Sequence, residues 1–219
     1  MKNILTQKEI EIPVDHIKLA GELTIPEEAK SIVVFVHGSG SSRYSPRNKQ
    51  VAERLQEEGY ATLLFDLLTQ EEDKDYSNRF EIPVLRERLL GVLEWLQKQA
   101  ETADLELGLF GASTGAAAAL EAASVLGDSI KALVSRGGRP DLASHVLPLV
   151  KAPALFIVGG LDYGVITLNE QAFALIKGEK DLVIVEEATH LFDEPGKLEE
   201  VIELAVNWFH KHLPYKVKA

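Results

Sequence analysis

The chain has 219 residues, of which 46% are hydrophobic, and its 34 acidic side chains against 23 basic ones give a formal net charge of −11. This negative charge argues against nucleic acid and anionic membranes as partners. The sequence contains no cysteine, which excludes disulfides, thiolate metal ligands and a cysteine nucleophile.

The length and composition are typical of one α/β domain with a large buried core, so we expect a single domain over residues 1–219. The N-terminal residues lack the apolar core of a signal peptide, and no apolar run is long enough to span a membrane. We therefore expect a cytoplasmic protein that does not insert into membranes.

The first predicted elements are strands. Residues 9–17 and 18–25 alternate polar and apolar side chains around a polar joint at Asp15 and His16, which predicts an antiparallel pair at the edge of a sheet. Residues 31–36 are a continuous run of β-branched and aromatic side chains after a single serine. Such a run is typical of a strand that is covered on both faces.

Strands and helices alternate through the rest of the chain. Further strands are predicted at about 60–65, 105–110, 130–135, 154–158 and 182–185. Helices are predicted at about 46–59, 83–99, 114–127, 163–176 and 197–212.

This alternation implies right-handed crossovers and a mostly parallel central sheet. We expect about seven or eight strands, an antiparallel N-terminal edge, and helices on both faces of the sheet. Functional groups then collect at the carboxyl ends of the strands. The polar residues that follow predicted strands are His37, Ser113, Arg136, Arg139, Asp162 and His190.

Ser113 lies in the stretch Gly111-Ala112-Ser113-Thr114-Gly115, between a predicted strand and an alanine-rich helix. In so short a turn the serine backbone is strained, and a Cβ at either glycine would collide with the facing strand and helix. The serine side chain then projects at a helix N-terminus, whose free N–H groups stabilise negative charge. In this context the G-x-S-x-G pattern predicts a serine nucleophile.

A serine hydroxyl needs a base that takes its proton, and the base needs an orienting carboxylate. Ser113, Asp162 and His190 supply these groups in the order nucleophile, acid, histidine. Alternatives remain open at this point, because Asp162 could instead cap the following helix. The rival acids are Asp66, Asp141 and Asp193, and the rival base is His145.

With these residues the chain resembles the α/β-hydrolase superfamily, and more closely its dienelactone-hydrolase-like subgroup. The resemblance rests on four motifs, H-G-S-G (37–40), G-A-S-T-G (111–115), G-G-L-D (159–162) and A-T-H-L-F (188–192). It implies an α/β-hydrolase fold. The segment between Ser135 and Pro153 is too short for a cap domain, so we expect no cap and an open site.

The resemblance implies that Ser113 is the nucleophile, that His190 is the general base and then acid, and that Asp162 fixes the imidazole tautomer. It also implies an oxyanion hole made by the backbone N–H groups of Ser39 and Thr114. Dienelactone hydrolases proper have a cysteine nucleophile where this chain has serine. That departure favours general ester or lactone hydrolysis through an acyl-serine intermediate, without metal or cofactor.

Four arginines lie near predicted strand ends, namely Arg43, Arg47, Arg136 and Arg139. They could hold an anionic substrate through bidentate contacts to a carboxylate or phosphate. The alternative is that they pair with acidic residues or brace their own turns.

Two other functions are compatible with the same residues. One is an acyltransferase or thioesterase that uses the same triad, and the other is a non-catalytic binding module with a hydrolase fold. Relatives of the subgroup also occur joined to phosphoribosyltransferase domains. The resemblance therefore raises the expectation of a partner of that type.

Overall fold

The computed structural model describes residues 4–215 of the chain. In this part the protein has one eight-stranded sheet, with the strand order β1-β2-β4-β3-β5-β6-β7-β8. The strands are β1 (Ile4–Val14), β2 (Ile17–Pro26), β3 (Ser31–Val36), β4 (Ala61–Phe65), β5 (Glu106–Ala112), β6 (Ile130–Arg136), β7 (Ala154–Gly159) and β8 (Lys180–Val185). The helices are α1 (Pro46–Glu58), α2 (Ile82–Lys98), α3 (Thr114–Leu126), α4 (Tyr163–Leu175) and α5 (Lys197–His212).

The sheet is parallel from β4 to β8, whereas β1 and β2 form an antiparallel pair at one edge. The predicted fold class is therefore confirmed, including its antiparallel N-terminal edge. β1 begins at Ile4, five residues before the predicted start, because its ladder with β2 continues through the pair Lys8 and Leu23. The side chains of this extension are mostly exposed, including those of Ile4 and Leu5, and they do not alternate between apolar and polar, so the hydrophobic pattern did not predict it.

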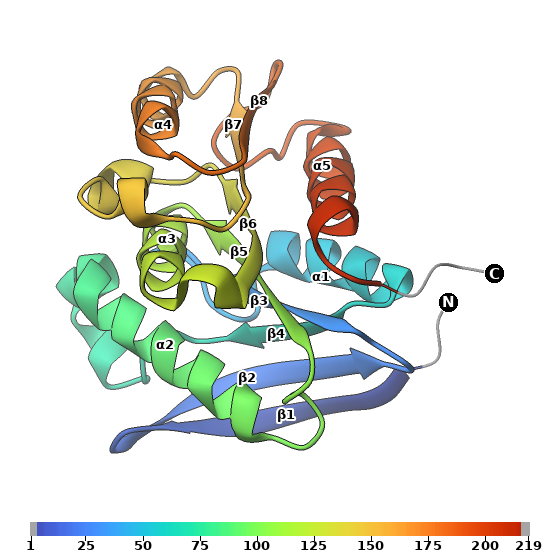
Figure 1. Cartoon of the computed structure of the whole chain (residues 1–219). Helices are drawn as coiled ribbons and strands as arrows, with labels where there is room; N and C mark the ends of the chain where they lie inside the picture. Colours follow the sequence, from blue (N-terminus) through green and yellow to red (C-terminus); the bar gives the residue numbers. More distant parts are fainter. Residues whose placement is uncertain (1–3, 216–219) are drawn as a thin grey trace.

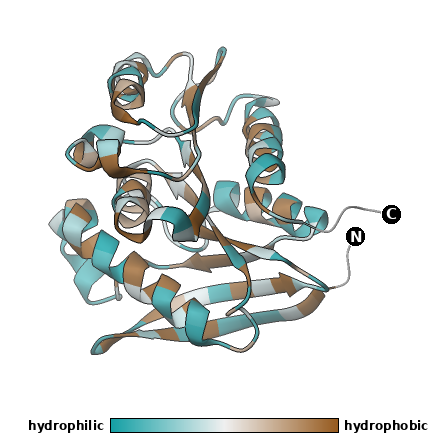
Figure 2. Ribbon diagram, viewed as in Figure 1, coloured by the Kyte–Doolittle hydropathy of each residue, from teal (hydrophilic) through white to brown (hydrophobic). Residues whose placement is uncertain are grey.

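Helices cover both faces of the sheet, as Figure 1 shows. α2, α3 and α4 lie on one face, and α1 and α5 lie together on the other. All six residues of β3 are buried, as expected of a strand that is covered on both sides. Figure 2 shows apolar residues concentrated in the central strands and on the sheet-facing sides of the helices.

The ends of α1 follow the sequence rules for helix caps. The Ser45 hydroxyl accepts a hydrogen bond from the Asn48 N–H, and Pro46 occupies the first turn. Gly59 ends the helix in the left-handed conformation, with φ of 95°. These caps place the N-terminus of α1 directly after the loop that follows β3.

Short 3₁₀ helices, which the sequence pattern did not predict, occur in two of the connections. The acidic loop between β4 and α2 contains two 3₁₀ helices, η1 (Glu72–Lys74) and η2 (Tyr76–Phe80). The connection between β6 and β7 contains only the 3₁₀ turns η4 (Pro140–Ala143) and η5 (Leu147–Leu149). No cap domain is inserted there, as predicted.

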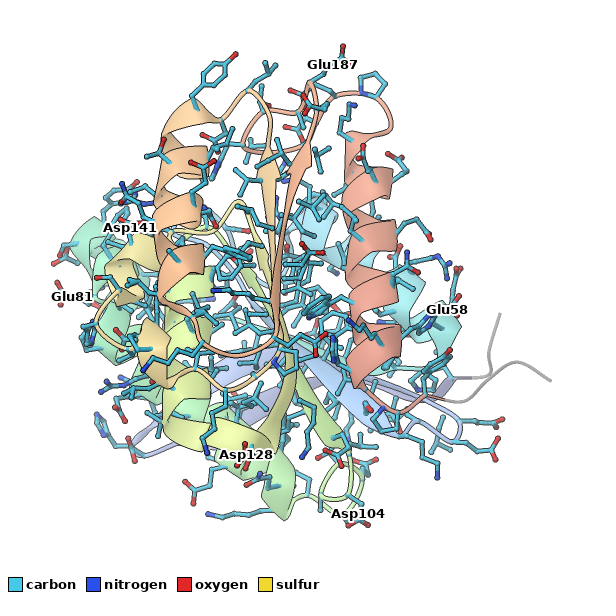
Figure 3. All side chains as sticks on the ribbon, turned by 45° about the horizontal axis from the view of Figure 1, so that its top comes forward. Glu58, Glu81, Asp104, Asp128, Asp141 and Glu187 are labelled. Atoms are coloured by element: carbon cyan, nitrogen blue, oxygen red, sulfur yellow. The ribbon has the colours of Figure 1, made fainter. Side chains whose placement is uncertain are left out.

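Acidic side chains are spread over the outside of the molecule. Figure 3 labels six of them around its periphery, on segments that are far apart in the sequence. These labelled acidic residues thus lie on different sides of the molecule in this view. Among residues 4–215, no helix combines the length and the hydrophobicity needed to cross a bilayer.

Candidate active site

Ser113 occupies a strained turn at the carboxyl end of β5. Its φ is 51° and its ψ is −124°, a backbone conformation that residues with a Cβ rarely adopt. Backbone hydrogen bonds hold the turn in place. The Ser113 N–H donates to the Arg136 carbonyl at 3.2 Å, and the Arg139 N–H donates to the Ser113 carbonyl at 3.0 Å. The predicted strain is therefore present, and the surrounding strand end fixes it.

The two glycines of the motif are required by close packing. A Cβ on Gly111 would lie 2.5 Å from the Ala116 Cα, and a Cβ on Gly115 would lie 2.2 Å from the Val36 carbonyl oxygen. Both contacts involve backbone atoms, which cannot move aside without displacing a strand or helix. The expected collisions with the neighbouring strand and helix are confirmed.

Substituting Gly115 by alanine is expected to lower the free energy of unfolding by roughly 1–3 kcal/mol, because the added methyl group overpacks the junction of α3 and β3. Gly164→Ala is the matched control, since that glycine lies in the first turn of α4 with open space around it. This control should be neutral or slightly stabilising. Urea denaturation of both variants tests the difference, and equal stabilities would contradict the packing argument.

His190 and Asp162 are in direct contact. The His190 Nδ1 lies 2.6 Å from the Asp162 Oδ2, and because an ionised carboxylate only accepts, Nδ1 donates and Nε2 is left to accept a proton. The ring also lies against the turn after β6, where a Cβ on Gly137 would be 3.3 Å from the His190 Cε1. Asp162 precedes α4 but makes no side-chain capping bond to it. The capping interpretation of Asp162 therefore has no support in the geometry.

The rival acids and the rival base are engaged elsewhere. Asp66 accepts a hydrogen bond from the Arg43 N–H at 2.8 Å and also pairs with the Arg43 guanidinium. Asp141 pairs with Arg139, Asp193 pairs with Arg47, and His145 lies 3.8 Å from Glu121. Of the four predicted acids, only Asp162 makes a described contact with His190.

Ser113 and His190 line the same pocket, which has a volume of about 210 Å³. Within residues 4–215 the Ser113 hydroxyl makes no hydrogen bond, to His190 or to any other group. Catalytic hydrogen bonds are often long in a free enzyme and shorten when the substrate binds. The structure thus brings the predicted nucleophile and base to one cavity, with the nucleophile unpaired.

The predicted oxyanion donors lie next to each other. The Ser39 N–H donates to the Thr114 Oγ1 at 2.9 Å, so a substrate oxygen would have to replace that hydroxyl. Thr114 is the first residue of α3, and its own N–H has no acceptor inside the helix. The contact between Ser39 and Thr114 was not foreseen, because it joins residues that are 75 positions apart.

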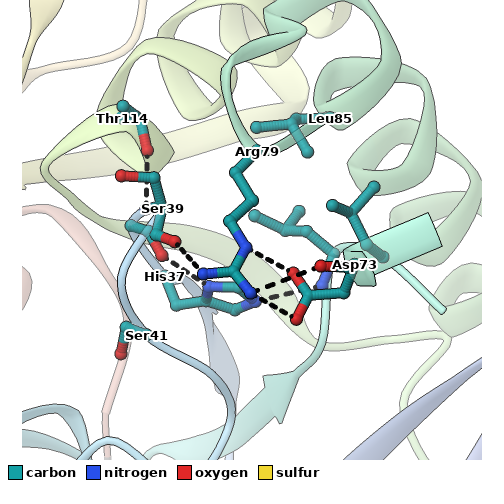
Figure 4. A pocket seen from close by; sticks show the side chains of 10 residues that line it. His37, Ser39, Ser41, Asp73, Arg79, Leu85 and Thr114 are labelled. Carbon is teal, nitrogen blue, oxygen red and sulfur yellow. Dashed lines mark hydrogen bonds and ion pairs between the residues drawn. The ribbon is translucent and has the colours of Figure 1, made fainter. Parts of the chain in front are cut away.

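Three further side chains hold the loop that carries Ser39, as Figure 4 shows. Arg79, from η2, donates to the Ser39 carbonyl at 3.1 Å and to the Asp73 carboxylate at 2.7 and 2.8 Å. The His37 ring accepts the Leu67 N–H at Nε2 and therefore donates from Nδ1 to the Gly38 carbonyl at 2.9 Å. Arg79 and Asp73 were not predicted as site residues. The only feature of the sequence that could have indicated this ion pair is the presence of opposite charges six residues apart.

His37 is a structural histidine. Burial lowers its pKa, and both ring nitrogens are used in hydrogen bonds, so the folded protein keeps this ring neutral and unable to act as a base.

The pH dependence of the free energy of unfolding should reflect the lowered pKa of His37. Because the pKa of His37 is lowered on folding, the folded protein binds fewer protons than the unfolded chain, and stability falls as the pH drops below about 6.5. We expect the urea midpoint of wild type to decrease from pH 7 toward pH 5, and His37→Gln to flatten that decrease. His212→Gln controls for a second histidine whose pKa burial also lowers. Parallel curves for wild type and His37→Gln would contradict the prediction.

The four arginines fall into two pairs. Arg43 and Arg139 are held by Asp66 and Asp141 and do not line the pocket that contains Ser113. Acidic neighbours thus hold these two arginines outside the pocket of Ser113, as the alternative interpretation of their role expects. Arg47 and Arg136 do line the pocket.

Arg136 is buried, with 7% of its surface exposed, and its Nε has no hydrogen-bond partner. Burial, with Arg47 nearby, lowers its pKa to about 10, although the Asp193 carboxylate opposes this shift from a distance. Arg136 is therefore charged at neutral pH, although no carboxylate within residues 4–215 pairs with it.

In the same part of the chain no three His, Asp or Glu side chains are grouped as a metal site requires.

Comparison with known proteins gives a consistent result. The model of the dienelactone hydrolase family matches residues 19–213. A dienelactone hydrolase from Anabaena variabilis, whose crystal structure is known, is 51% identical, with a TM-score of 0.92 over 95% of this chain and 99% of that one. Est1E from Butyrivibrio proteoclasticus is 18% identical, with a TM-score of 0.78 over 93% of this chain and 98% of its own. The likeness to Est1E shows the fold alone.

Two curated relatives, from two strains of Mycobacterium tuberculosis, are 53% identical over 209 residues and are provisionally named phosphoribosyl transferases. The match covers 95% of this chain but 47% of each relative. The chain thus spans about half the length of the curated relatives that it matches.

Proposed function

Because the chain belongs to the dienelactone hydrolase family, we propose that it is a serine hydrolase that cleaves carboxylic esters or lactones. The observation that carries this proposal is the 2.6 Å contact between His190 and Asp162, beside the pocket that Ser113 lines. A strained serine, a histidine with a free Nε2 and an orienting carboxylate are the three groups that acyl transfer to serine needs.

In the proposed reaction, His190 Nε2 removes the Ser113 proton as Oγ attacks the substrate carbonyl. The carbonyl oxygen becomes an anion that the N–H groups of Ser39 and Thr114 stabilise. Collapse breaks the C–O bond, and the imidazolium gives its proton to the leaving alkoxide. In a lactone the alcohol stays attached to the acyl group. Water then attacks the acyl-serine with His190 again as base, which releases the acid and restores Ser113.

The size of the pocket supports a preference for small acyl groups. It holds about 210 Å³, and the short β6–β7 connection adds no cap above it. Long acyl chains would therefore stay in solvent and contribute little binding energy. We propose that short or exposed esters and small lactones are the substrates.

A panel of p-nitrophenyl esters, lactones and thioesters tests this function. We expect kcat/KM to be highest for acetyl and butyryl esters and to stop rising with longer chains. Adding an alcohol acceptor distinguishes acyl transfer from hydrolysis, since a transferase would form a new ester at the expense of free acid. Turnover of thioesters alone would contradict ester hydrolysis. The phosphoribosyltransferase-type partner and the cytoplasmic location stay predictions.

A further inference from the structure

Arg136 is an unpaired cation inside the pocket of the proposed nucleophile. It ends β6, next to the residue that precedes Ser113, because its Cα pairs with that of Ala112. Its guanidinium carbon lies 5.9 Å from the centre of the Phe192 ring, and the side chain lines the pocket with Ser113 and His190. A buried cation without a hydrogen-bonded anion is costly. An anion bound in the pocket would therefore stabilise the Arg136 guanidinium.

A second cation and a helix N-terminus share this pocket. Arg47 lies in the first turn of α1 and lines the same cavity. Its partner Asp193 has a side chain that is 58% exposed and 3.0 Å away, so water weakens their attraction. The first turn of α1 adds the partial positive charge of a helix N-terminus. Ser39, Ser41 and Ser45 also line this pocket. The Ser45 hydroxyl accepts the Asn48 N–H and keeps its own proton to donate.

We propose that Arg136, Arg47 and the first turn of α1 form a phosphate subsite, so that the substrate is an ester or lactone that carries a phosphomonoester group. This inference rests on the proposed function, and it specifies the substrate class. The subsite and Ser113 line one cavity, so the phosphate and the scissile carbonyl belong to the same small molecule.

The donors favour phosphate over carboxylate. A phosphomonoester has three terminal oxygens and a charge of about −1.5 to −2 at pH 7, whereas a carboxylate has two oxygens and one charge. Two guanidinium groups and three hydroxyls provide more donors than two oxygens accept. A phosphate can also contact both arginines, because the Arg47 Nε has no hydrogen-bond partner while its Nη1 is bound to Asp193.

Binding of phenyl phosphate, measured by calorimetry at constant ionic strength, tests the subsite without turnover. Benzoate presents the same ring with a carboxylate. We expect phenyl phosphate to bind at least tenfold more tightly than benzoate and to inhibit p-nitrophenyl acetate hydrolysis competitively. Arg136→Met and Arg47→Gln should each weaken phenyl phosphate binding roughly tenfold or more, as loss of charge-assisted hydrogen bonds implies.

Arg139→Gln is the matched control, because that arginine follows the same strand but pairs with Asp141, and it should bind phenyl phosphate like wild type. Thermal denaturation separates binding from a structural role. If Arg136 serves the ligand, Arg136→Met removes an unpaired buried charge and should keep or raise the Tm. If Arg136 braces the fold, the same variant should lower the Tm.

Three results would overturn the proposal. They are equal binding of benzoate, no binding of phenyl phosphate, and binding that neither Arg136→Met nor Arg47→Gln weakens. Failure of the ester panel alongside tight phenyl phosphate binding would instead contradict only the hydrolase proposal. Active esterase without phosphate binding would contradict only the subsite.

Discussion

Ser113→Ala is expected to lower kcat by about 10⁴ to 10⁶, as loss of the nucleophile does in serine hydrolases. The alanine has no oxygen to attack the carbonyl, so any residual rate comes from the oxyanion donors and substrate binding. Stability should stay nearly unchanged, because the Ser113 hydroxyl makes no hydrogen bond among residues 4–215 and alanine has the same Cβ.

Steady-state kinetics on a p-nitrophenyl ester measure this effect. Ser124→Ala is the control, since it makes the same change near the other end of α3, where the hydroxyl only donates to the Glu121 carbonyl. The control should keep wild-type kcat and KM. A Ser113→Ala protein with full esterase activity would mean that another group is the nucleophile.

Asp162→Asn is expected to reduce kcat by up to roughly 10⁴, with a smaller effect on KM. The asparagine can donate to His190 Nδ1, which stabilises the tautomer with the proton on Nε2. That tautomer cannot accept the Ser113 proton. The imidazolium formed during attack also loses the opposing charge of the carboxylate.

Asp66→Asn tests the choice of acid, because Asp66 also follows a strand but pairs with Arg43. It should affect stability more than kcat. If Asp66→Asn were nearly inactive and Asp162→Asn active, the assignment of the acid would be wrong.

The buried parallel strands were predictable because burial on both faces leaves a continuous apolar run. Residues 31–36 were predicted as a strand, and β3 has those bounds. The ends of α1 were predictable because Ser45-Pro46 and Gly59 have local conformational preferences that act without tertiary contacts. The start of β1 was not predictable. Its first residues are held by backbone pairing with β2, and their side chains do not alternate between apolar and polar.

Within the candidate site, the order of Ser113, Asp162 and His190 along alternating strands and helices was enough to predict that they meet at one sheet edge. The individual contacts of the arginines were not predictable in the same way. Arg136 and Arg139 are three residues apart, yet one is buried and unpaired and the other pairs with Asp141. Arg136 is the last residue of β6, whereas Arg139 lies in the turn before η4 and is two residues from Asp141.

The contact between Ser39 and Thr114 depends on how β3 and α3 pack, which a sequence pattern does not encode. Arg79 reaches the Ser39 carbonyl from a loop whose 3₁₀ turns were not expected. Long-range contacts between loops are therefore the part of the site that required the structure.

Labelling with a fluorophosphonate probe, followed by mass spectrometry of the digested protein, tests most directly that Ser113 is an activated nucleophile. We predict one adduct per wild-type chain, located on Ser113, with none on Ser113→Ala and much slower labelling of Asp162→Asn. An unmodified wild-type protein, or an adduct on another residue that persists in Ser113→Ala, would contradict the proposed mechanism.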